Sequence, residues 1–397
     1  MKLSIIIPAY NEEQSIASII ERTLAARSVI TAKTPITSVE VIIVNDGSKD
    51  KTPDIAKGYK DITLITYQKN KGYGAAIKLG FAQAHGDLLG FLDADGTCDP
   101  LFFVTLINSL LKKNADIAIG SRLGPESKMP KIRRIGNKIY AVIINFLANV
   151  TITDSASGMR IIKQSTLHKL YPLPDGLHFT PAMSCKALMN HELKIIEEPM
   201  SYQEREGRSK LNIINDGIRF LKTIAEVALY YKPLKVFFTS GMVLIVISFL
   251  YSLYPIFFYL KHHRIEEWFI YRLISILVFS LVGLNFIVFG LFADKFVAII
   301  NNQESAIDRI NNKLFCWILE PWNIFKIGLF ISFLGIALNI KTIHQYITLG
   351  HIYVHWVYVL TGAVLILSGM VVFTFGFLHK ILDMYKERRD YLNQSHK

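Results

Sequence analysis

The hydrophobic pattern divides the chain at about residue 231. Before this point, apolar runs of strand length alternate with stretches whose apolar residues recur at helical spacing. Beyond residue 235, longer apolar runs take over, most of them near or above the ~20 residues that cross a bilayer as a helix. The pattern therefore predicts a globular domain followed by a membrane domain.

Five apolar runs in the first part predict buried β-strands. They are continuous rather than alternating, which is typical of strands covered by helices on both faces. The runs cover residues 3–10, 39–46, 62–67, 88–95 and 115–120, and helical stretches cover residues 11–26, 53–59, 75–84 and 101–112. Asn11 is predicted to cap the first helix. This alternation predicts an α/β fold whose sheet is mainly parallel, with helices on both faces.

Four segments in the second part predict membrane spans, near residues 236–260, 273–292, 325–341 and 352–378. The third is short, and it spans only if Lys326 and Lys341 extend their charged ends to the two interfaces. The alternative for this segment is a re-entrant or interfacial helix, which would move the C-terminus to the other side of the membrane.

An amphipathic stretch connects the two parts. Apolar residues recur at steps of three and four from Leu211 to Leu229, and polar residues such as Arg219 lie opposite them. We expect this helix to lie in the membrane interface, with a helix packed on the core as the alternative. The predicted domains are a globular domain (1–209), the interfacial helix (210–234), a membrane domain (235–380) and a tail (381–397).

Flanking charges predict the orientation. Lys222, Lys232 and Lys235 precede the first span, and basic residues from Lys380 to Arg389 follow the last. Because positive charge favours the cytoplasmic side, both ends and the globular domain are expected in the cytoplasm, at the plasma (inner) membrane. Met1 leads directly into a strand-like run, so no secretory signal peptide is expected.

Composition narrows the functional classes. Of the 397 residues, 51% are hydrophobic, which is high for a soluble domain, and the net charge is +12. Next to membrane spans, this charge favours anionic lipid or phosphorylated substrates over nucleic acid. The three cysteines, Cys98, Cys185 and Cys316, are widely spaced and predict neither a zinc site nor a disulfide framework.

Polar segments follow three of the predicted strands. PAYNEE, NDGS and DADG end the strands at 3–10, 39–46 and 88–95, and the carboxyl ends of parallel strands border one crevice. Asp93 and Asp95 lie two residues apart, so in a strand they point to the same side. Two such carboxylates suit Mg²⁺ or Mn²⁺ shared with substrate phosphates. The alternative is a turn capped by solvated aspartates.

A glycine-containing segment, NKGYGAA, begins a predicted helix at residues 70–76. It follows the third strand and lacks the third glycine of a dinucleotide fingerprint, so NAD binding is not expected. A phosphate group near this helix start is compatible with the pattern.

Seven motifs occur in a recognisable order: IIIPAYNEE, VIIVNDGSKDKT, NKGYGAA, FLDADG, IGSR, DSASGMR and EREGRSK. Together they resemble family 2 glycosyltransferases of the GT-A fold, and more narrowly the polyprenyl-phosphate glycosyltransferases of the dolichol-phosphate mannose synthase type. The resemblance covers residues 1–231. It implies a metal-dependent enzyme of cell-envelope glycan biosynthesis that moves a hexose from a nucleotide-diphosphate sugar to a dolichyl or undecaprenyl phosphate.

The resemblance also assigns roles to individual residues. It implies that the nucleotide sugar contacts Pro8, Tyr10, Glu12, Asp46 and Asp93, and that Asp93 and Asp95 hold the metal. Phosphates of donor or acceptor would be bound by basic residues: Arg122, Arg133 or Arg134, Arg205, Arg208 and Lys210. Guanidinium groups suit this task because they form bidentate bonds to phosphate. Asp93, Asp95 and Arg122 form the implied catalytic group.

Three residues depart from the family pattern. Asn45 replaces the first aspartate of the usual DDGS, Thr97 stands where relatives often have a glutamine near the metal, and Asn137 stands where a serine near the acceptor phosphate is usual. These departures concern the donor base and the full metal coordination.

The chemistry of the implied acceptor predicts the mechanism. A polyprenyl phosphate with a second pKa near ~6 is mostly a dianion at neutral pH and needs no general base. A single displacement then inverts the anomeric carbon. The alternatives are a hydroxyl-lipid acceptor with Asp154 as base, a processive polysaccharide synthase, and an inactive membrane-tethered binding module. The sugar, the nucleotide and any homo-oligomer formation are left open by the sequence.

Overall fold

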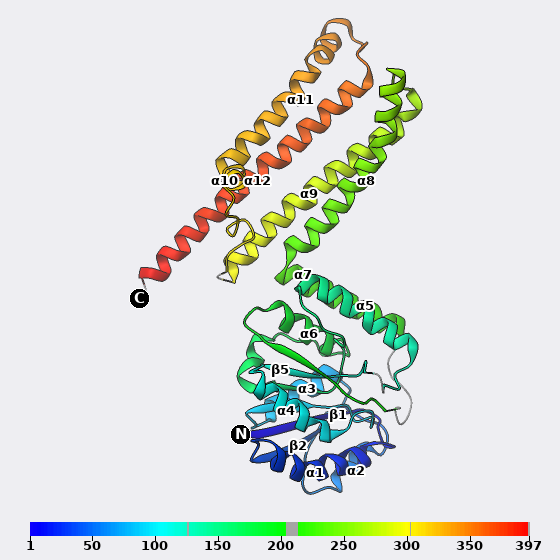
Figure 1. Cartoon of the computed structure of the whole chain (residues 1–397), viewed down its shortest axis with the longest axis vertical. Helices are drawn as coiled ribbons and strands as arrows, with labels where there is room; N and C mark the ends of the chain where they lie inside the picture. Colours follow the sequence, from blue (N-terminus) through cyan, green and yellow to red (C-terminus); the bar gives the residue numbers. More distant parts are fainter. Residues whose placement is uncertain (125–126, 204–212, 302, 396–397) are drawn as a thin grey trace. The chain divides into compact units, whose positions relative to one another are not determined.

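The computed structural model describes residues 1–124, 127–203, 213–301 and 303–395 (Figure 1). It consists of two compact units, Met1–Tyr231 and Lys232–Lys397, which are described separately. The first unit contains a sheet with helices, and the second contains long apolar helices.

The first unit is built on a seven-stranded sheet in the order β3-β2-β1-β4-β6-β5-β7. Strand β6 runs antiparallel to both of its neighbours, and every other pair is parallel. The predicted fold class, a mainly parallel α/β sheet, is confirmed. The strands are β1 (Lys2–Ala9), β2 (Ser38–Asn45), β3 (Thr63–Thr66), β4 (Leu88–Phe91), β5 (Ile117–Ser121), β6 (Arg160–Lys163) and β7 (Ile195–Pro199).

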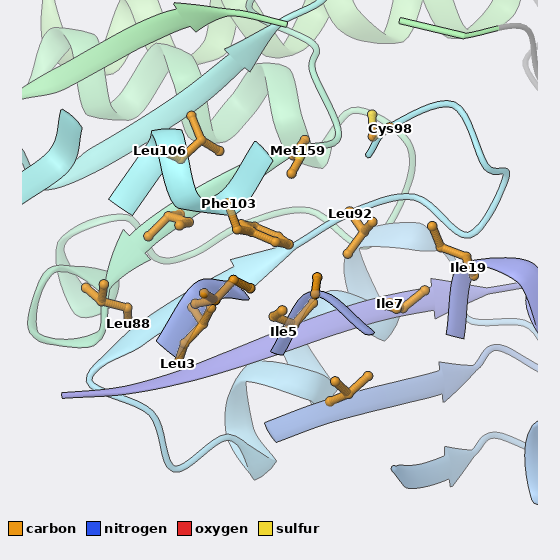
Figure 2. Packing of buried hydrophobic residues seen from close by; sticks show 14 of the residues in the cluster. Leu3, Ile5, Ile7, Ile19, Leu88, Leu92, Cys98, Phe103, Leu106 and Met159 are labelled. Atoms are coloured by element: carbon orange, nitrogen blue, oxygen red, sulfur yellow. The ribbon is translucent and has the colours of Figure 1, made fainter. Parts of the chain in front are cut away.

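Helices cover both faces of this sheet. The side chains of β1 alternate between the two faces, so both faces bury apolar residues. Ile5 and Ile7 face a core that includes Phe103 of the helix after β4, as Figure 2 shows. Ile6 points the other way and contacts Gly80 of a different helix. The helices of this unit are α1 (Ile16–Lys33), α2 (Thr52–Lys57), α3 (Tyr73–Gln83), α4 (Phe103–Lys112), α5 (Lys131–Ala148), α6 (Phe179–Met189) and α7 (Ile213–Tyr231).

Two local predictions are wrong. Helix α1 follows Ser15, so Asn11 is not its cap. Asn11 instead has a φ of +50°, and its side chain accepts a hydrogen bond from the Lys49 amide over 2.8 Å. The strand predicted to reach residue 95 ends at Phe91, because β6 pairs with it only from Leu88 to Phe91.

Among its described residues, the second unit contains four helices that are long and apolar enough to cross a membrane: α8 (Pro233–His262), α9 (Ile270–Ile300), α11 (Pro321–Leu349) and α12 (Trp356–Ser395). They identify the chain as an integral membrane protein. The third is longer than its predicted 325–341. A short helix, α10 (Lys313–Leu319), precedes it.

Glycines allow these long helices to pack closely in pairs. A Cβ at Gly241 of α8 would lie 2.7 Å from the carbonyl oxygen of Gly283 in α9, and a Cβ at Gly335 of α11 would lie 2.6 Å from that of Gly362 in α12. Both distances are shorter than van der Waals contact. Larger residues would therefore force the helices apart, as is typical of small residues at membrane helix contacts.

Candidate active site

A cavity of about 440 Å³ lies in the first unit, at the edge of the sheet where β1, β2, β4 and β5 have their carboxyl ends. The rule that ligands bind outside the carboxyl ends of such strands predicts this place. Eight of the residues to which the resemblance assigns nucleotide, metal or phosphate binding line it: Pro8, Tyr10, Glu12, Asp46, Asp93, Asp95, Arg122 and Arg133.

Asp46 connects the end of β2 to the loop before α3. Its two carboxylate oxygens accept hydrogen bonds from the backbone amides of Lys71 and Gly72, over 2.7 and 2.9 Å. The side chain is only 2% exposed, and burial raises its pKa although the two amides oppose this rise. Gly72 has a φ of +106°, which favours glycine at this turn. Asp46 therefore fixes one wall of the cavity.

Asn45, which departs from the family pattern, has a structural role. Its side-chain oxygen accepts a hydrogen bond from the Ser48 amide over 3.2 Å and so shapes the turn after β2. The adjoining backbone is held by hydroxyl groups: Ser48 accepts from the Asn11 amide, and Thr52 accepts from the Glu12 amide. The ends of β1 and β2 are thereby joined into one surface.

Asp93 and Asp95 both line the cavity, but not through strand alternation. Both lie after the end of β4, in a turn that contains Gly96 at a φ of +75°. Oδ1 of Asp93 accepts a hydrogen bond from the Tyr73 hydroxyl over 2.7 Å. Oδ1 of Asp95 accepts from the hydroxyl of Thr97 over 2.6 Å and from its amide over 3.2 Å. Thr97 thus orients a carboxylate.

The donor set fits a hard divalent cation. Among the described residues, no group of three or more histidines, cysteines or acids gathers in a way that would hold a metal by itself. Two oriented carboxylates on one cavity suit Mg²⁺ or Mn²⁺, which keep further positions for waters and substrate phosphates. Asp93 and Asp95 are the residues that would hold it.

A positive group lines the same cavity. Arg122 follows β5, and its Nε and Nη2 donate to Asp154 Oδ2 and Oδ1 over 2.7 and 2.9 Å. Its backbone amide also donates to Asp154. Burial would raise the pKa of Asp154, but the Arg122 guanidinium outweighs this effect and lowers it. Burial would lower the pKa of Arg122, but the Asp154 carboxylate outweighs this effect, and the pKa of Arg122 is raised. Both groups are therefore charged at neutral pH.

The remaining basic candidates differ in position. Arg133 of α5 lines the cavity, whereas Nη2 of Arg134 donates to the Ser127 carbonyl over 3.1 Å. Arg205, Arg208 and Lys210 lie outside the described residues. Asn137 lines the cavity and approaches Asp154 at 3.5 Å.

Sequence reasoning missed several residues of the cavity. Helix α7 contributes Asp216, Arg219 and Phe220, and Tyr73 comes from the start of α3. The polar face of α7 is the sequence signal for Asp216 and Arg219, whereas Phe220 carries no polar signal. Tyr73 lies inside the segment at 70–76, in which the glycines are the signal for a phosphate site.

A buried arginine organises the loop that precedes β6. Arg160 is fully buried, and its guanidinium donates to the carbonyls of Ser155 and Ser157 and to the Ser184 hydroxyl over 2.8 to 2.9 Å. Burial lowers its pKa to about 10, so it stays charged at neutral pH. This loop carries Gly158, which borders the cavity.

Comparison with known proteins gives consistent results. Residues 4–171 match the profile of "Glycosyl transferase family 2". Low-salt glycan biosynthesis hexosyltransferase Agl6 of Haloferax volcanii is 30% identical over 241 residues, which are 58% of this chain and 55% of Agl6. Dolichyl-phosphate hexose transferase of the same organism is 30% identical over 237 residues, 57% of this chain and 94% of that protein. The chain thus spans about half the length of the former and nearly all of the latter.

Two further proteins show similarity to the chain. Dolichyl-phosphate beta-glucosyltransferase of Drosophila melanogaster is 33% identical over 186 residues, 43% of this chain and 57% of that protein. Among solved structures, glucosyl-3-phosphoglycerate synthase from Mycobacterium tuberculosis, in complex with Mn²⁺, uridine diphosphate and phosphoglyceric acid, gives a TM-score of 0.47 at 18% identity, covering 57% of this chain and 78% of that one. As the motifs predict, the chain belongs to the family 2 glycosyltransferases and is related to the dolichyl- and polyprenyl-phosphate hexosyltransferases.

Proposed function

We propose that the protein transfers a hexose from a nucleotide-diphosphate sugar to a polyprenyl phosphate, dolichyl or undecaprenyl, with inversion at the anomeric carbon. One observation carries this proposal: a single cavity is lined both by two oriented carboxylates, Asp93 and Asp95, and by the guanidinium of Arg122. The carboxylates suit a metal on a donor diphosphate, and the guanidinium suits a second phosphate. The relationship to dolichyl-phosphate hexose transferase supports the same acceptor.

The donor side of the cavity is formed by the ends of β1, β2 and β4. Pro8, Tyr10, Glu12 and Asp46 are the residues we assign to the nucleotide, next to the two acids. Bound Mg²⁺ or Mn²⁺ would neutralise charge on the departing diphosphate. Asp93 and Asp95, held by Tyr73 and Thr97, would keep the diphosphate in one orientation for attack.

The acceptor side is formed by Arg122 and Arg133. Nε and Nη2 of Arg122 both donate hydrogen bonds to the Asp154 carboxylate, so the plane of the guanidinium is fixed before any substrate binds. A fixed cation attracts a phosphate dianion and aligns it without reorganisation during the reaction. Because this dianion is already a nucleophile, the site needs no histidine or other general base.

Asp154 is poorly suited to act as a general base, which weakens the hydroxyl-lipid alternative. The Arg122 guanidinium lowers its pKa, and both of its oxygens already accept hydrogen bonds. A base at neutral pH works best with a pKa near 7. The position of Asp154 therefore favours a phosphate acceptor, which needs no deprotonation.

An apolar surface of the first unit supports a lipid acceptor. Helix α7 exposes Ile214, Ile218 and Leu221, and α5 exposes a second stripe: Ile132, Ile135, Ile139, Val142 and Phe146. The two helices touch through Tyr140 and Phe220, whose ring centres are 5.7 Å apart and which both line the cavity. We infer that this surface lies on the membrane, at the cytoplasmic face that the flanking charges predict.

The test is nucleotide release by the purified protein in detergent, with a panel of sugar nucleotides, with and without polyprenyl phosphate, and with Mg²⁺, Mn²⁺ or EDTA. We expect release that requires both the lipid phosphate and the metal and that is lost in Asp95→Ala. The exposed surface variant Asp54→Ala is the matched control and should behave as wild type. Absence of lipid-dependent release with every donor would contradict the proposal, and a product of retained configuration would contradict the single displacement.

A further inference from the structure

Tyr73 is the side chain that joins helix α3 to the acidic turn after β4. Its hydroxyl donates to Asp93 Oδ1 over 2.7 Å. Its ring meets Phe179 of α6 edge to face at 6.5 Å, and Phe179 in turn meets Phe91, the last residue of β4, at 6.1 Å. The phenol is therefore held from two elements while it lines the cavity.

A second segment, the loop before β6, also confines the Asp93 carboxylate. A Cβ at Gly158 would overlap both oxygens of Asp93, so the loop before β6 approaches the acid as closely as a glycine allows. Oδ1 is held by the Tyr73 hydroxyl, and Oδ2 lies against the backbone at Gly158. These contacts leave the carboxylate little freedom to rotate about its Cβ–Cγ bond.

The two acids of the turn share one arrangement. Each has its Oδ1 held by a hydroxyl group, from Tyr73 for Asp93 and from Thr97 for Asp95. Thr97 lies two residues from its acid, whereas Tyr73 lies 20 residues from Asp93 and reaches it only because α3 starts at this edge of the sheet. Hydrogen bonds from outside a metal's own ligands orient those ligands and tune their affinity.

We propose that Tyr73 is a positioning residue that sets the direction in which Asp93 presents its carboxylate to the divalent cation and donor diphosphate. This inference rests on the proposed function for the identity of the ligand. Tyr73 acts through Asp93, so the loss of its hydroxyl weakens metal binding and leaves the acceptor side, formed by Arg122 and Arg133, unchanged.

The first experiment compares Tyr73→Phe with wild type in direct Mn²⁺ binding, followed by the electron paramagnetic resonance signal of free Mn²⁺, with UDP or GDP added. We expect the Mn²⁺ dissociation constant to rise by about tenfold or more. The Mn²⁺ concentration for half-maximal nucleotide release should rise in parallel, with an unchanged KM for polyprenyl phosphate. Tyr59→Phe is the matched control. The Tyr59 hydroxyl also donates to a carboxylate, that of Glu21, over 2.9 Å, but neither residue lines the cavity.

Two further variants separate positioning from a general structural role. Gly158→Ala leaves Tyr73 intact but displaces the Asp93 carboxylate from its other side, so it should also weaken Mn²⁺ binding. In a double-mutant cycle, Tyr73→Phe should add little to Asp93→Asn, because its effect passes through that acid. Thermal unfolding of each variant reports whether the fold is retained.

The outcomes distinguish this inference from the proposed function. Unchanged Mn²⁺ affinity in Tyr73→Phe, or losses that simply add in the cycle, would overturn the role of Tyr73. A lowered melting temperature with wild-type Mn²⁺ affinity would also overturn it, since that result marks a purely structural residue. If wild type binds Mn²⁺ but releases no nucleotide with any lipid phosphate, the proposed function fails, while the Mn²⁺ measurement still decides the role of Tyr73.

Discussion

Arg122 and Asp154 form a bidentate ion pair that the fold assembles from two loops at one edge of the sheet, with bond lengths of 2.7 and 2.9 Å. Asp154 is fully buried, and its backbone amide and that of Thr153 donate to Glu197 in β7. The pair is thus anchored to β7, the outermost strand next to β5, so the position of the guanidinium depends on the sheet.

We predict that Asp154→Asn impairs both stability and acceptor use. The substitution leaves a buried guanidinium without its counter-charge, which costs on the order of 3–5 kcal/mol of unfolding free energy. It also lets Arg122 move within the cavity, so kcat/KM for polyprenyl phosphate should fall by about 10–100-fold. Denaturant unfolding and kinetics with a varied acceptor measure the two effects, with the exposed Asp54→Asn as control.

A second prediction concerns acid pH. The Arg122 guanidinium lowers the pKa of Asp154 in the folded state, relative to about 3.9 in an unfolded chain. A depressed folded pKa contributes stability that is fully present above the unfolded pKa and is lost as the pH falls through the folded one. The stability difference between wild type and Asp154→Asn should therefore stay constant from about pH 8 to 5 and shrink below about pH 4. A difference that grows on acidification would show that the pair is not ionised.

How far the sequence predicts the site depends on the distance between interacting residues. The ends of β1, β2 and β4 were found because each motif directly follows an apolar run, and the strand-end rule places them together. The sequence does not predict the hydrogen-bond partners of the site residues. Tyr73 holds Asp93 from a different element, and Asp154 holds Arg122 although the two lie 32 residues apart in the sequence. Such contacts depend on how helices and loops pack, which periodicity does not encode.

The sequence also leaves part of the sheet unpredicted, because short strands give a weak hydrophobic pattern. The sequence does not predict strand β6 because Arg160–Lys163 has only two apolar residues, Ile161 and Ile162, and follows a polar loop. Thr97 was interpreted as a lost metal contact from its position alone. The structure shows that its hydroxyl orients Asp95, a role that depends on the turn geometry after β4.

A third prediction concerns an ion pair in the membrane unit whose lysine is buried. Lys295 of α9 lies 2.5 Å from Asp383 and 2.7 Å from His379, both in α12, and it is only 2% exposed. Asp383→Leu leaves the buried Lys295 ammonium without its counter-charge and should destabilise the protein by about 3 kcal/mol or more, whereas the double variant Lys295→Met/Asp383→Leu should recover most of that loss. Thermal unfolding in detergent measures both. Equal melting temperatures for the single and double variants would contradict the assignment.

The last prediction concerns membrane orientation, for which the chain carries a native reporter. Cys98 and Cys185 are buried, and burial raises the pKa of Cys185 to about 12, so neither should react with a membrane-impermeant maleimide in the folded protein. Cys316 is exposed and lies between the second and third apolar helices. With both ends in the cytoplasm, we expect it to be labelled in inverted membrane vesicles and protected in intact cells.

A second position makes this test independent of the reporter's own reactivity. His351 is exposed between α11 and α12, so His351→Cys in a Cys316→Ser background should show the opposite accessibility if α11 crosses the bilayer. Labelling of both positions from the same side would mean that α11 does not cross, as in the re-entrant alternative. Labelling of Cys316 in intact cells and of His351→Cys in inverted vesicles would mean that the first unit, with its cavity, lies outside the cytoplasm. Since sugar nucleotides are charged and do not cross a bilayer unaided, that result would also contradict the proposed use of a cytoplasmic donor.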